Sequence, residues 1–407
     1  MLSYVRTISI HAFIMIKEID MGTINHANQI IKKLKSEGHE AYIVGGAVRD
    51  HLLGLKPVDF DLTTSAKPNQ VMKLFESRAT GFKYGTITVL MDQFTYEVTT
   101  YRTDGPSEDQ RHPDYVFFGT SVEEDVLRRD FTINGMLMDE HGEITDYVSG
   151  QDDLKQKTIK TIGEPYLRFS EDALRILRAI YFQGKLNFSI EDETYEAMKK
   201  MAGLLTTLSN ERLIVELSKI IKTDYQLKAI DTLHTLNLHH HIKGIEETID
   251  VIVKKKKSIT PETFFTVAYY FDEKNMSQWT FSNKLKHKFH TAGQLSKENV
   301  KLSAQHLFDY GLEIVKLAAR TQAYLFDTSY AMNKLEYMYE HLPIKSAVDL
   351  KMKSTEMMAL THKKAGAWIK DVQDDMVKKI LSHELKNERT ELFLYFRETY
   401  VKGLKHE

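Results

Sequence analysis

The pattern of hydrophobic and polar positions changes along the chain. In the first 165 residues short apolar runs alternate with turn residues, and the run Ala41-Tyr42-Ile43-Val44 is the clearest of them. From Ser170 onward apolar residues recur at helical spacing, as in Ala173-Leu174-Ile176-Leu177-Ile180. Five of the seven prolines lie at or before Pro165, and only four glycines follow residue 250. This punctuation predicts an α+β chain: an N-terminal mixed α/β head, with a small β-sheet and flanking helices, and then a long helical part.

Three elements of the head can be placed from local pattern. Thr86-Ile87-Thr88-Val89-Leu90 and Phe94 to Thr100 flank Asp92-Gln93, which predicts a β-hairpin. Val48 to Leu53 has a helix-like pattern. The polar segment from Thr103 to Ser121 predicts a long loop, and long loops beside active sites are often functional.

Size and composition limit the class of protein. At 407 residues the chain exceeds what one hydrophobic core usually supports, so two or more domains or a multi-lobed body are expected. Hydrophobic residues make up 42% and charged residues 28%, as in soluble globular proteins. No run approaches the roughly 18 apolar residues of a membrane span, which predicts no membrane partner. The absence of cysteine excludes disulfides and cysteine-ligated zinc.

The N-terminal stretch Met1 to Ile16 is mildly apolar but lacks the order of a signal peptide. This favours a cytoplasmic protein. Met15 and Met21 could also begin the chain, so residues 1–22 are expected to be an extension from an upstream start codon.

Charge is unevenly distributed although the net charge is only −2. Residues 101–150 hold 12 acidic residues and 4 Lys/Arg, whereas residues 251–300 hold 9 Lys/Arg and 4 acidic residues. An acidic first half and a basic second half fit a metal site at one end and a polyanion held at the other. Ordinary solvated faces explain the basic segment equally well.

The most informative residues are Asp59-Phe60-Asp61, shortly after Gly45-Gly46. Because strand side chains alternate, two carboxylates at i and i+2 share one face, and hard oxygen donors suit Mg²⁺. Glycines between the strand at 41–44 and the following helix let backbone N–H groups approach a phosphate closely. A phosphate cradle beside metal-binding carboxylates indicates nucleotidyl or phosphoryl transfer.

The run from Gly45 to Thr64 resembles the signature of the polymerase-beta-like nucleotidyltransferase superfamily. It is similar to the version found in tRNA CCA-adding enzymes and bacterial poly(A) polymerases, the class II group. The resemblance implies catalytic and metal-binding roles for Asp59 and Asp61, and nucleotide contacts from Gly46 and Arg49. It places the third carboxylate of the superfamily at Glu97, which could instead orient an arginine or lie on the solvent face.

Two later elements extend the resemblance. Arg128-Arg129-Asp130-Phe131-Thr132-Ile133-Asn134 resembles the RRDFTxN motif, in which Arg129, Asp130 and Asn134 contact the nucleotide. Arginine forks suit triphosphate oxygens, and an Asp or Asn can bond a ribose hydroxyl. The residues from Asp139 to Asp146, with Gly150 and Asp153, resemble a structural turn that supports the junction of head and neck.

Glu171-Asp172-Ala173-Leu174-Arg175 resembles the E-D-x-x-R helix that acts as an amino-acid template for the base edges of CTP and ATP. Asp172 and Arg175 are expected at i and i+3 on one helix, with Arg178 one turn further; alternatively the two only bond each other. The family commonly has another arginine where this chain has Tyr181. Ser209-Asn210-Glu211-Arg212, followed by Glu216, resembles a motif that braces this helix, with Ser209 as its N-cap.

Together these motifs predict template-independent addition of C, C and A to the tRNA 3′ end from CTP and ATP with Mg²⁺, and contacts to the acceptor stem. The expected division is a catalytic head at 23–150, a nucleotide-selecting neck at 151–224, a body at 225–290 and a tRNA-binding tail at 291–407. A bacterial poly(A) polymerase, an enzyme adding only C or only A, or an RNA-binding protein with an inactive transferase domain are the alternatives. The sequence leaves a homodimer open. The short cluster His239-His240-His241 is expected at a surface or helix end.

Overall fold

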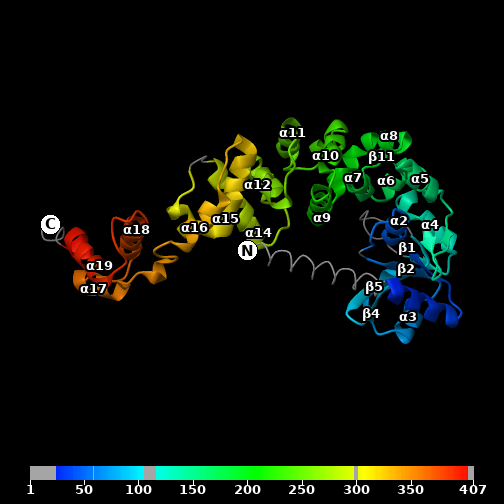
Figure 1. Cartoon of the computed structure of the whole chain (residues 1–407), viewed down its shortest axis with the longest axis horizontal. Helices are drawn as coiled ribbons and strands as arrows, with labels where there is room; N and C mark the ends of the chain where they lie inside the picture. Colours follow the sequence, from blue (N-terminus) through cyan, green and yellow to red (C-terminus); the bar gives the residue numbers. More distant parts are fainter. Residues whose placement is uncertain (1–23, 58, 105–115, 298–300, 402–407) are drawn as a thin grey trace, which may run out of the picture. The chain divides into compact units, whose positions relative to one another are not determined.

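The computed structural model describes residues 24–57, 59–104, 116–297 and 301–401. The chain divides into two compact units, Met1–Ile242 and Lys243–Glu407, and each is described by itself (Figure 1). The predicted extension at residues 1–22 lies outside the described residues.

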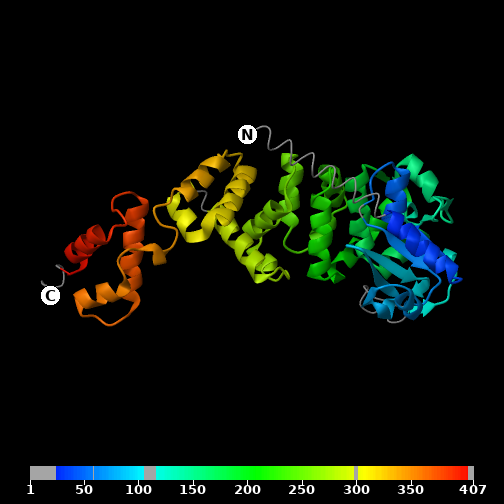
Figure 2. The same cartoon turned by 60° about the horizontal axis from the view of Figure 1, so that its bottom comes forward.

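A mixed β-sheet forms the centre of the head. Within the described residues its strand order is β3-β4-β5-β2-β1-β8-β9, and only β2 and β5 run parallel. Figure 2 shows these blue and teal strands from a second direction. The strand bounds are β1 (Ala41–Val44), β2 (Asp61–Thr64), β3 (Ser77–Gly81), β4 (Thr86–Met91), β5 (Phe94–Thr100), β8 (Leu137–Met138) and β9 (Ile144–Thr145).

The apolar run at 41–44 forms an inner strand of this sheet, as its composition predicts. β1 pairs with β2 on one side and with β8 on the other. Val44 packs in the core with Val126 and Leu137. The helices of the head are a stretch at residues 24–36, α2 (Gly46–Leu52), α3 (Pro68–Leu74) and α4 (Val122–Leu127).

The hairpin prediction is confirmed by β4 and β5, which pair antiparallel from Thr86↔Thr99 to Met91↔Phe94. Asp92 in its turn has φ 54°, a conformation that Asp tolerates better than most residues. The prediction of a continuous loop from 103 to 121 is wrong at its ends. β6 (Arg102–Asp104) pairs with β7 (Val116–Phe118), and residues 105–115 lie outside the described residues.

The rest of the first unit is helical apart from the short parallel pair β10 (Thr158–Ile159) and β11 (Ser189–Ile190). The helical prediction from residue 170 is thus confirmed, although the first helix begins earlier. The helices are α5 (Gly150–Gln156), α6 (Pro165–Glu171), α7 (Leu174–Leu186), α8 (Asp192–Lys200), α9 (Asn210–Ile221) and α10 (Gln226–Thr235).

All regular secondary structure in the described residues of the second unit is helical. Phe265, Trp279, Phe281 and Phe289 form an aromatic cluster in its core. The helix α15 contains a kink at Gly311, where φ is 76°. The helices are α11 (Glu246–Lys255), α12 (Pro261–Phe271), α13 (Glu273–Met276), α14 (Asn283–Lys297), α15 (Ala304–Phe326), α16 (Met332–Glu340), α17 (Ser354–Thr361), α18 (Ala367–Leu381) and α19 (Arg389–Phe396), with a π-helical turn at Arg397–Val401.

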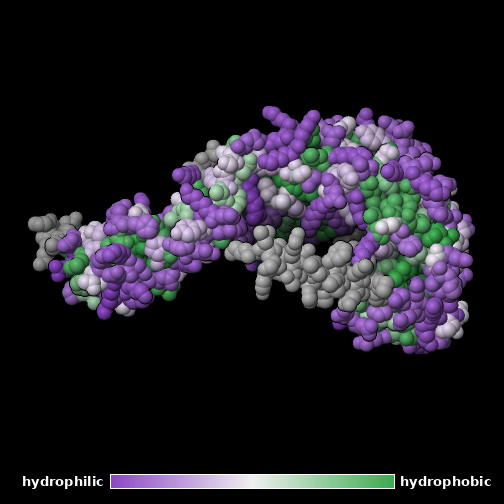
Figure 3. Space-filling model, viewed as in Figure 1, coloured by the Kyte–Doolittle hydropathy of each residue, from purple (hydrophilic) through white to green (hydrophobic). Residues whose placement is uncertain are grey.

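Hydrophilic residues predominate on the face drawn in Figure 3, and hydrophobic residues gather in smaller patches. Among the described helices, none combines the length and the apolar character needed to cross a membrane.

The turn predicted from Asp139 to Asp153 packs against the 3₁₀ turn Thr132–Asn134. Asp146 accepts backbone N–H bonds from Val148, Gly150 and Gln151. Asp153 accepts from the Thr132 hydroxyl at 2.6 Å, and a Cβ at Gly150 would collide with the Thr132 carbonyl oxygen. This close approach locks α5 against the 3₁₀ turn Thr132–Asn134.

Gly150→Ala should therefore destabilise the first unit by about 1–3 kcal/mol, through overpacking against backbone that cannot move away. Its thermal midpoint should fall by several degrees, at roughly 2–4 °C per kcal/mol. Gly203→Ala is the matched control, because a Cβ there meets nothing within 4 Å. Equal midpoints for the two variants would contradict the proposed locking.

Candidate active site

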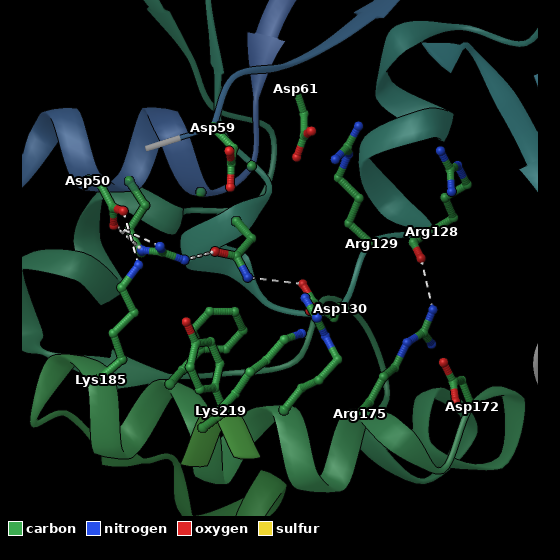
Figure 4. A pocket seen from close by; sticks show the side chains of 17 residues that line it. Asp50, Asp59, Asp61, Arg128, Arg129, Asp130, Asp172, Arg175, Lys185 and Lys219 are labelled. Carbon is green, nitrogen blue, oxygen red and sulfur yellow. Dashed lines mark hydrogen bonds and ion pairs between the residues drawn. The ribbon is translucent and has the colours of Figure 1, made fainter. Parts of the chain in front are cut away.

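One pocket of about 550 Å³ gathers residues from the head and the helices that follow it (Figure 4). Of the residues predicted for the site, all but Glu97 line it: Gly46, Arg49, Asp59, Asp61, Arg129, Asp130, Asn134, Asp172, Arg175 and Arg178. It is also lined by residues for which no role was predicted: Asp50, Phe182, Lys185 and Lys219.

The expectation that Asp59 and Asp61 both lie on one strand is wrong. β2 begins at Asp61, and Asp59 lies in the segment that leads into it. Their side chains still share one side, because Phe60 between them is only 4% exposed and turns into the core. Both carboxylates project into the pocket (Figure 4).

Glu97 lies beside Asp61 in the parallel pair of β2 and β5, in direct register. Burial and then the Glu97 charge raise the pKa of Asp61 to about 6, with Arg129 acting in the opposite direction. Carboxylates placed against one another in this way resist ionisation unless a cation joins them. Their hard oxygen donors fit a divalent metal ion such as Mg²⁺.

The glycine pair has a local conformational reason. Gly45 has φ 75°, in the left-handed region that favours glycine, and it links β1 to α2. A Cβ on Gly45 would come within 3.9 Å of the Asp61 carboxylate, and one on Gly46 within 3.4 Å of the Arg49 guanidinium. Both distances are ordinary contacts, so the positive φ of Gly45 is what requires glycine in this turn next to the carboxylates.

A buried chain of hydrogen bonds crosses the back of the pocket. Arg49 donates to Asn134 Oδ1 at 2.6 Å, and Asn134 Nδ2 donates to Asp130 Oδ1 at 3.1 Å. Arg178 Nε donates to Asp130 Oδ2 at 2.7 Å. Burial alone would raise the pKa of Asp130, but the Arg178 charge and these hydrogen bonds hold it below its ordinary value. This chain joins α2, the Arg128–Asn134 motif and α7.

Asp50 extends this wall toward α7. Arg49 Nε donates to Asp50 Oδ1 at 2.8 Å, and Lys185 Nζ bonds Asp50 Oδ2 at 3.0 Å. Both bonds are drawn in Figure 4.

Asp125 holds the two arginines of the pocket, Arg128 and Arg129, and this role was not predicted from the sequence. It is fully buried, and it pairs with Arg128 at 2.7 Å and with Arg129 at 3.0 Å. Although burial opposes ionisation, the two arginines hold its pKa below the ordinary value. The spacing offered a signal, because Asp125 stands three and four residues before the two arginines near the end of a helix.

The expectation of a continuous helix through Asp172 and Arg175 is wrong. α6 ends at Glu171 and α7 begins at Leu174, with Asp172 in extended conformation between them. Asp172 Oδ1 accepts the N–H of Leu174 at 3.0 Å, so its short polar side chain caps the new helix.

Asp172 and Arg175 are held by different partners. Arg212 Nη2 donates to both carboxylate oxygens of Asp172 at 2.8 Å. Arg175 donates to Glu171 Oε2 at 2.7 Å and to the Arg128 carbonyl at 3.0 Å. The Arg175 backbone N–H donates to the Asp172 carbonyl at 3.1 Å. Among the side-chain bonds of the described residues, however, none joins Asp172 to Arg175, so the alternative of a simple mutual salt bridge is not what this structure shows.

The bracing motif occupies α9 as expected. Ser209 stands at the N-cap position, but its side chain makes no capping bond in the described structure. Glu216 is 1% exposed and pairs with Lys219 at 3.2 Å, while the Lys219 ammonium lies 5.9 Å from the ring centre of Tyr181. Tyr181, at the position where the family commonly has arginine, lines the pocket.

Parts of this chain match three protein families. Residues 41–160 match the family described as the poly A polymerase head domain, and residues 263–395 match tRNA nucleotidyltransferase domain 2 (putative). Residues 187–248 match the probable RNA and SrmB-binding site of polymerase A. The CCA-adding enzyme of Bacillus pumilus is 36% identical over 390 residues, which cover 89% of this chain and 94% of that protein.

This chain belongs to the CCA-adding enzyme family. A second relative, the CCA-adding enzyme of Staphylococcus haemolyticus, is 34% identical over 93% of this chain and 99% of its own length. The crystal structure of the Bacillus stearothermophilus CCA-adding enzyme in complex with CTP has a TM-score of 0.83 and 29% identity, and it covers 95% of this chain and 99% of that one. Members of this family are nucleotidyltransferases and generally depend on a metal ion.

The raised pKa of Asp61 has a consequence for stability. A carboxylate whose pKa is higher in the folded state than in the unfolded state costs stability once the pH exceeds its unfolded pKa, and the full cost is present above about pH 6. Asp61→Asn should therefore raise the stability of the metal-free protein at pH 7.5 by on the order of 1 kcal/mol, after allowance for solvent screening.

The same substitution should bring little gain at pH 4, where Asp61 of the folded wild-type protein is already protonated. Thermal midpoints of both proteins at the two pH values, measured with a chelator present, test this expectation. A gain of equal size at both pH values, or a loss at pH 7.5, would show that charge repulsion is not the cause.

Proposed function

We propose that this protein adds C, C and A to the 3′ end of tRNA without a nucleic-acid template, using CTP and ATP and releasing pyrophosphate. One observation carries the proposal: Asp59 and Asp61 share a single pocket with Asp172, Arg175 and Arg178 in a chain that matches CCA-adding enzymes over most of its length. The reacting phosphate and the base of one nucleotide can therefore be held at the same time.

Asp59 and Asp61 would hold Mg²⁺, which lowers the pKa of the attacking 3′-hydroxyl and neutralises charge on the triphosphate. Both residues line the pocket, where a metal ion can also take phosphate ligands. Glu97 does not line the pocket, so its proposed catalytic role is indirect: it adds negative charge beside Asp61 and so favours the bound cation.

The phosphates and the ribose would lie between the carboxylates and the Arg128–Asn134 motif. Arg129 is fixed by Asp125 through one Nη atom and keeps donors for phosphate oxygens. Gly46 and Arg49 bound the same space from α2. The Asp130 carboxylate and the Asn134 amide take part in the buried chain of hydrogen bonds, and they therefore fix Arg49 and Arg178. Contact with the ribose is the second role proposed for them.

Asp172 and Arg175 would read the base. An ionised carboxylate offers about four acceptor sites, and Asp172 uses three of them for Leu174 and Arg212. Arg175 has five N–H donors and uses three. Cytosine and adenine share an exocyclic amino donor beside a ring-nitrogen acceptor, which the remaining acceptor of Asp172 and donors of Arg175 can match.

Contacts with the acceptor stem are proposed for the basic stretch from Lys254 to Lys301. Part of its charge is already paired, as in Lys255 with Asp327 at 2.8 Å and Lys288 with Glu262 at 2.6 Å. Lys254 and Lys256 are exposed. We keep the division into neck (151–224), body (225–290) and tail (291–407) as a proposal, although the match to a tRNA nucleotidyltransferase domain at 263–395 spans the body–tail boundary and the two compact units divide after Ile242.

Incubation with tRNA lacking its terminal CCA, with each labelled nucleotide singly and then together, tests the proposed reaction. We expect addition of two C residues from CTP alone, and of A only once both are present. Asp59→Ala should lower incorporation by at least about 10²-fold while tRNA binding stays nearly intact. Long A tracts would indicate a poly(A) polymerase, addition of a single kind of nucleotide a specialised enzyme, and no incorporation an inactive RNA-binding protein.

Nucleotide choice should depend on Asp172 and Arg175. UTP and GTP would set a carbonyl against the carboxylate and an N–H against the guanidinium, and unpaired groups of this kind cost about 1–3 kcal/mol each. Asp172→Ala and Arg175→Ala should therefore relax selectivity against UTP or GTP by about 10-fold or more, measured as ratios of kcat/KM.

Arg212→Ala is the control for that experiment, because it removes a partner of Asp172 and leaves the carboxylate in place. It should slow the reaction with a smaller loss of selectivity. If the Asp172 and Arg175 variants merely slow the enzyme and keep the full preference for C and A, the pair is structural and does not read the base.

A further inference from the structure

Arg168 is a buried cation that lies outside the nucleotide pocket of the first unit. It belongs to α6 and is 8% exposed, and it is not among the described residues that line that pocket. A charged side chain is rarely buried unless it is paired and hydrogen-bonded. The bonds that Arg168 makes therefore indicate which parts of the site it holds together.

Arg168 and Arg175 together hold three consecutive carbonyl groups. Arg168 Nη2 donates to the carbonyl oxygens of Leu127 and Arg129, both at 2.9 Å. Arg175 Nη2 donates to the carbonyl between them, that of Arg128, at 3.0 Å (Figure 4). These carbonyls lie where α4 ends, and a helix end leaves carbonyl groups without intrahelical partners. The two guanidinium groups therefore fix the main chain that carries the Arg128 and Arg129 side chains.

Glu171 closes these bonds into a ring, called the arginine ring below, which consists of Arg168, Glu171, Arg175 and the three carbonyls. Glu171 Oε2 accepts from Arg168 Nη1 at 2.8 Å and from Arg175 Nη1 at 2.7 Å. Arg175 Nη1 also donates to the Arg168 carbonyl at 3.0 Å. Burial and then the adjacent Arg175 charge lower the pKa of Arg168, and the Glu171 charge opposes them. Neither guanidinium can therefore move without a change in the bonds of the other.

The main chain also ties the segment before α6 to the same arginine motif. Phe131 forms an antiparallel bridge with Thr161, and the Ile162 N–H donates to the Asp130 carbonyl at 3.0 Å. α6 begins shortly after this bridge. Arg168 thus closes a short segment of chain that is bonded to the motif at both of its ends, so that α6 and the motif are held as one piece.

We propose that Arg168 is a positioning residue that couples the reading of the base to the placement of the triphosphate. The proposal rests on the proposed function and on the base-reading role of Arg175. A base that bonds Arg175 keeps the arginine ring intact, and the ring holds the Arg129 side chain where it meets a phosphate beside Asp59 and Asp61.

A mismatched base has the opposite effect on the ring. It sets an N–H against the Arg175 guanidinium and displaces it, and the shift reaches Arg129 through the neighbouring carbonyls. A displacement of about 1 Å in a reacting group can cost about 10²-fold in rate. Part of the discrimination against a wrong base should therefore appear in kcat and not only in nucleotide binding.

Arg168→Met tests the coupling, because it keeps an unbranched side chain and removes the guanidinium. With tRNA lacking its CCA end, kcat for CTP should fall about 30- to 100-fold, while the KM for CTP stays within about threefold. The kcat for UTP should fall less than about threefold, because a mismatched base already lacks the coupling. Arg168→Lys should restore only part of the kcat for CTP, since one ammonium group cannot span two carbonyls and Glu171.

A double-mutant cycle with Arg129→Ala tests the route of the coupling. If Arg168 acts through Arg129, Arg168→Met should lower the kcat for CTP less than about threefold once Arg129 has been replaced. The same loss with and without the Arg129 side chain would overturn the proposal. So would an equal loss of kcat for CTP and for UTP in the single variant, which is the result expected if Arg168 only stabilises the fold.

Leu233→Ala is the control for stability, because Leu233 is fully buried in α10 and belongs to neither the arginine ring nor the pocket. It should lower the thermal midpoint and leave the ratio of kcat for CTP to kcat for UTP unchanged. A fall of this ratio in Leu233→Ala to the level of Arg168→Met would overturn the proposal. If Arg168→Met does not fold, Arg168→Lys is measured instead, and an unchanged ratio in that variant counts against the coupling.

Incorporation by the wild-type protein tests the proposed function separately. Only the ratios of variant to wild type test the coupling, so a failure of one is not mistaken for a failure of the other.

Discussion

The buried hydrogen-bond chain Arg49–Asn134–Asp130–Arg178 is the interaction on which the rest of the site depends. It runs from α2 of the head to α7, and three of its four side chains are less than 10% exposed. Each charge in it is met by a hydrogen-bonding partner, which is the condition under which buried ions are tolerated. Removal of one partner from a buried pair typically costs about 3–5 kcal/mol, so this chain holds the wall with Asp59 and Asp61 and the wall proposed to read the base at a set separation.

The direction of the pKa shift separates the carboxylates of the site by role. Asp125 and Asp130 are buried, yet paired arginines hold their pKa values below the ordinary range. Asp61 departs in the other direction, because burial and the adjacent Glu97 outweigh the effect of Arg129. The first two pair with arginines of the protein, whereas no ion pair of the described residues involves Asp61. A raised pKa of this kind is expected of a carboxylate with the metal-binding role proposed for Asp61.

Most of the local structure follows from the sequence, and what could not be predicted is the consequence of contacts between distant segments. The hairpin and the helices are local, so pattern alone predicts them. The register that sets Asp61 beside Glu97 arises from a parallel pair of strands more than thirty residues apart, and spacing says nothing about it. The motif placed Arg129 in the site but not its anchor Asp125, whose i, i+4 spacing was a usable signal.

The prediction of a continuous helix through Asp172 was wrong for a reason that the sequence contains. Helical spacing around residues 171–178 hid the fact that Asp is a helix-capping residue, and Asp172 uses that ability to start α7. The break turns its carboxylate away from Arg175 and toward Arg212 on α9. Had the two groups lain on one helix turn, they could have neutralised each other and offered little to a ligand.

Recognition of a base by side chains needs donors and acceptors that are held rigidly. They must also keep some hydrogen-bonding capacity that is not used within the protein. Arg212 and Glu171 provide the rigidity, because each fixes one member of the pair from a different direction. Asp172 uses three of about four acceptor sites, and Arg175 uses three of five N–H donors. One acceptor site and two donors, each with a fixed direction, therefore remain for a base. A loosely held pair could rotate to suit uracil or guanine, whereas a fixed pair exposes those bases to unmatched groups. On the proposed role of this pair, selectivity depends first on Asp172 and Arg175 and to a smaller degree on the partners that hold them.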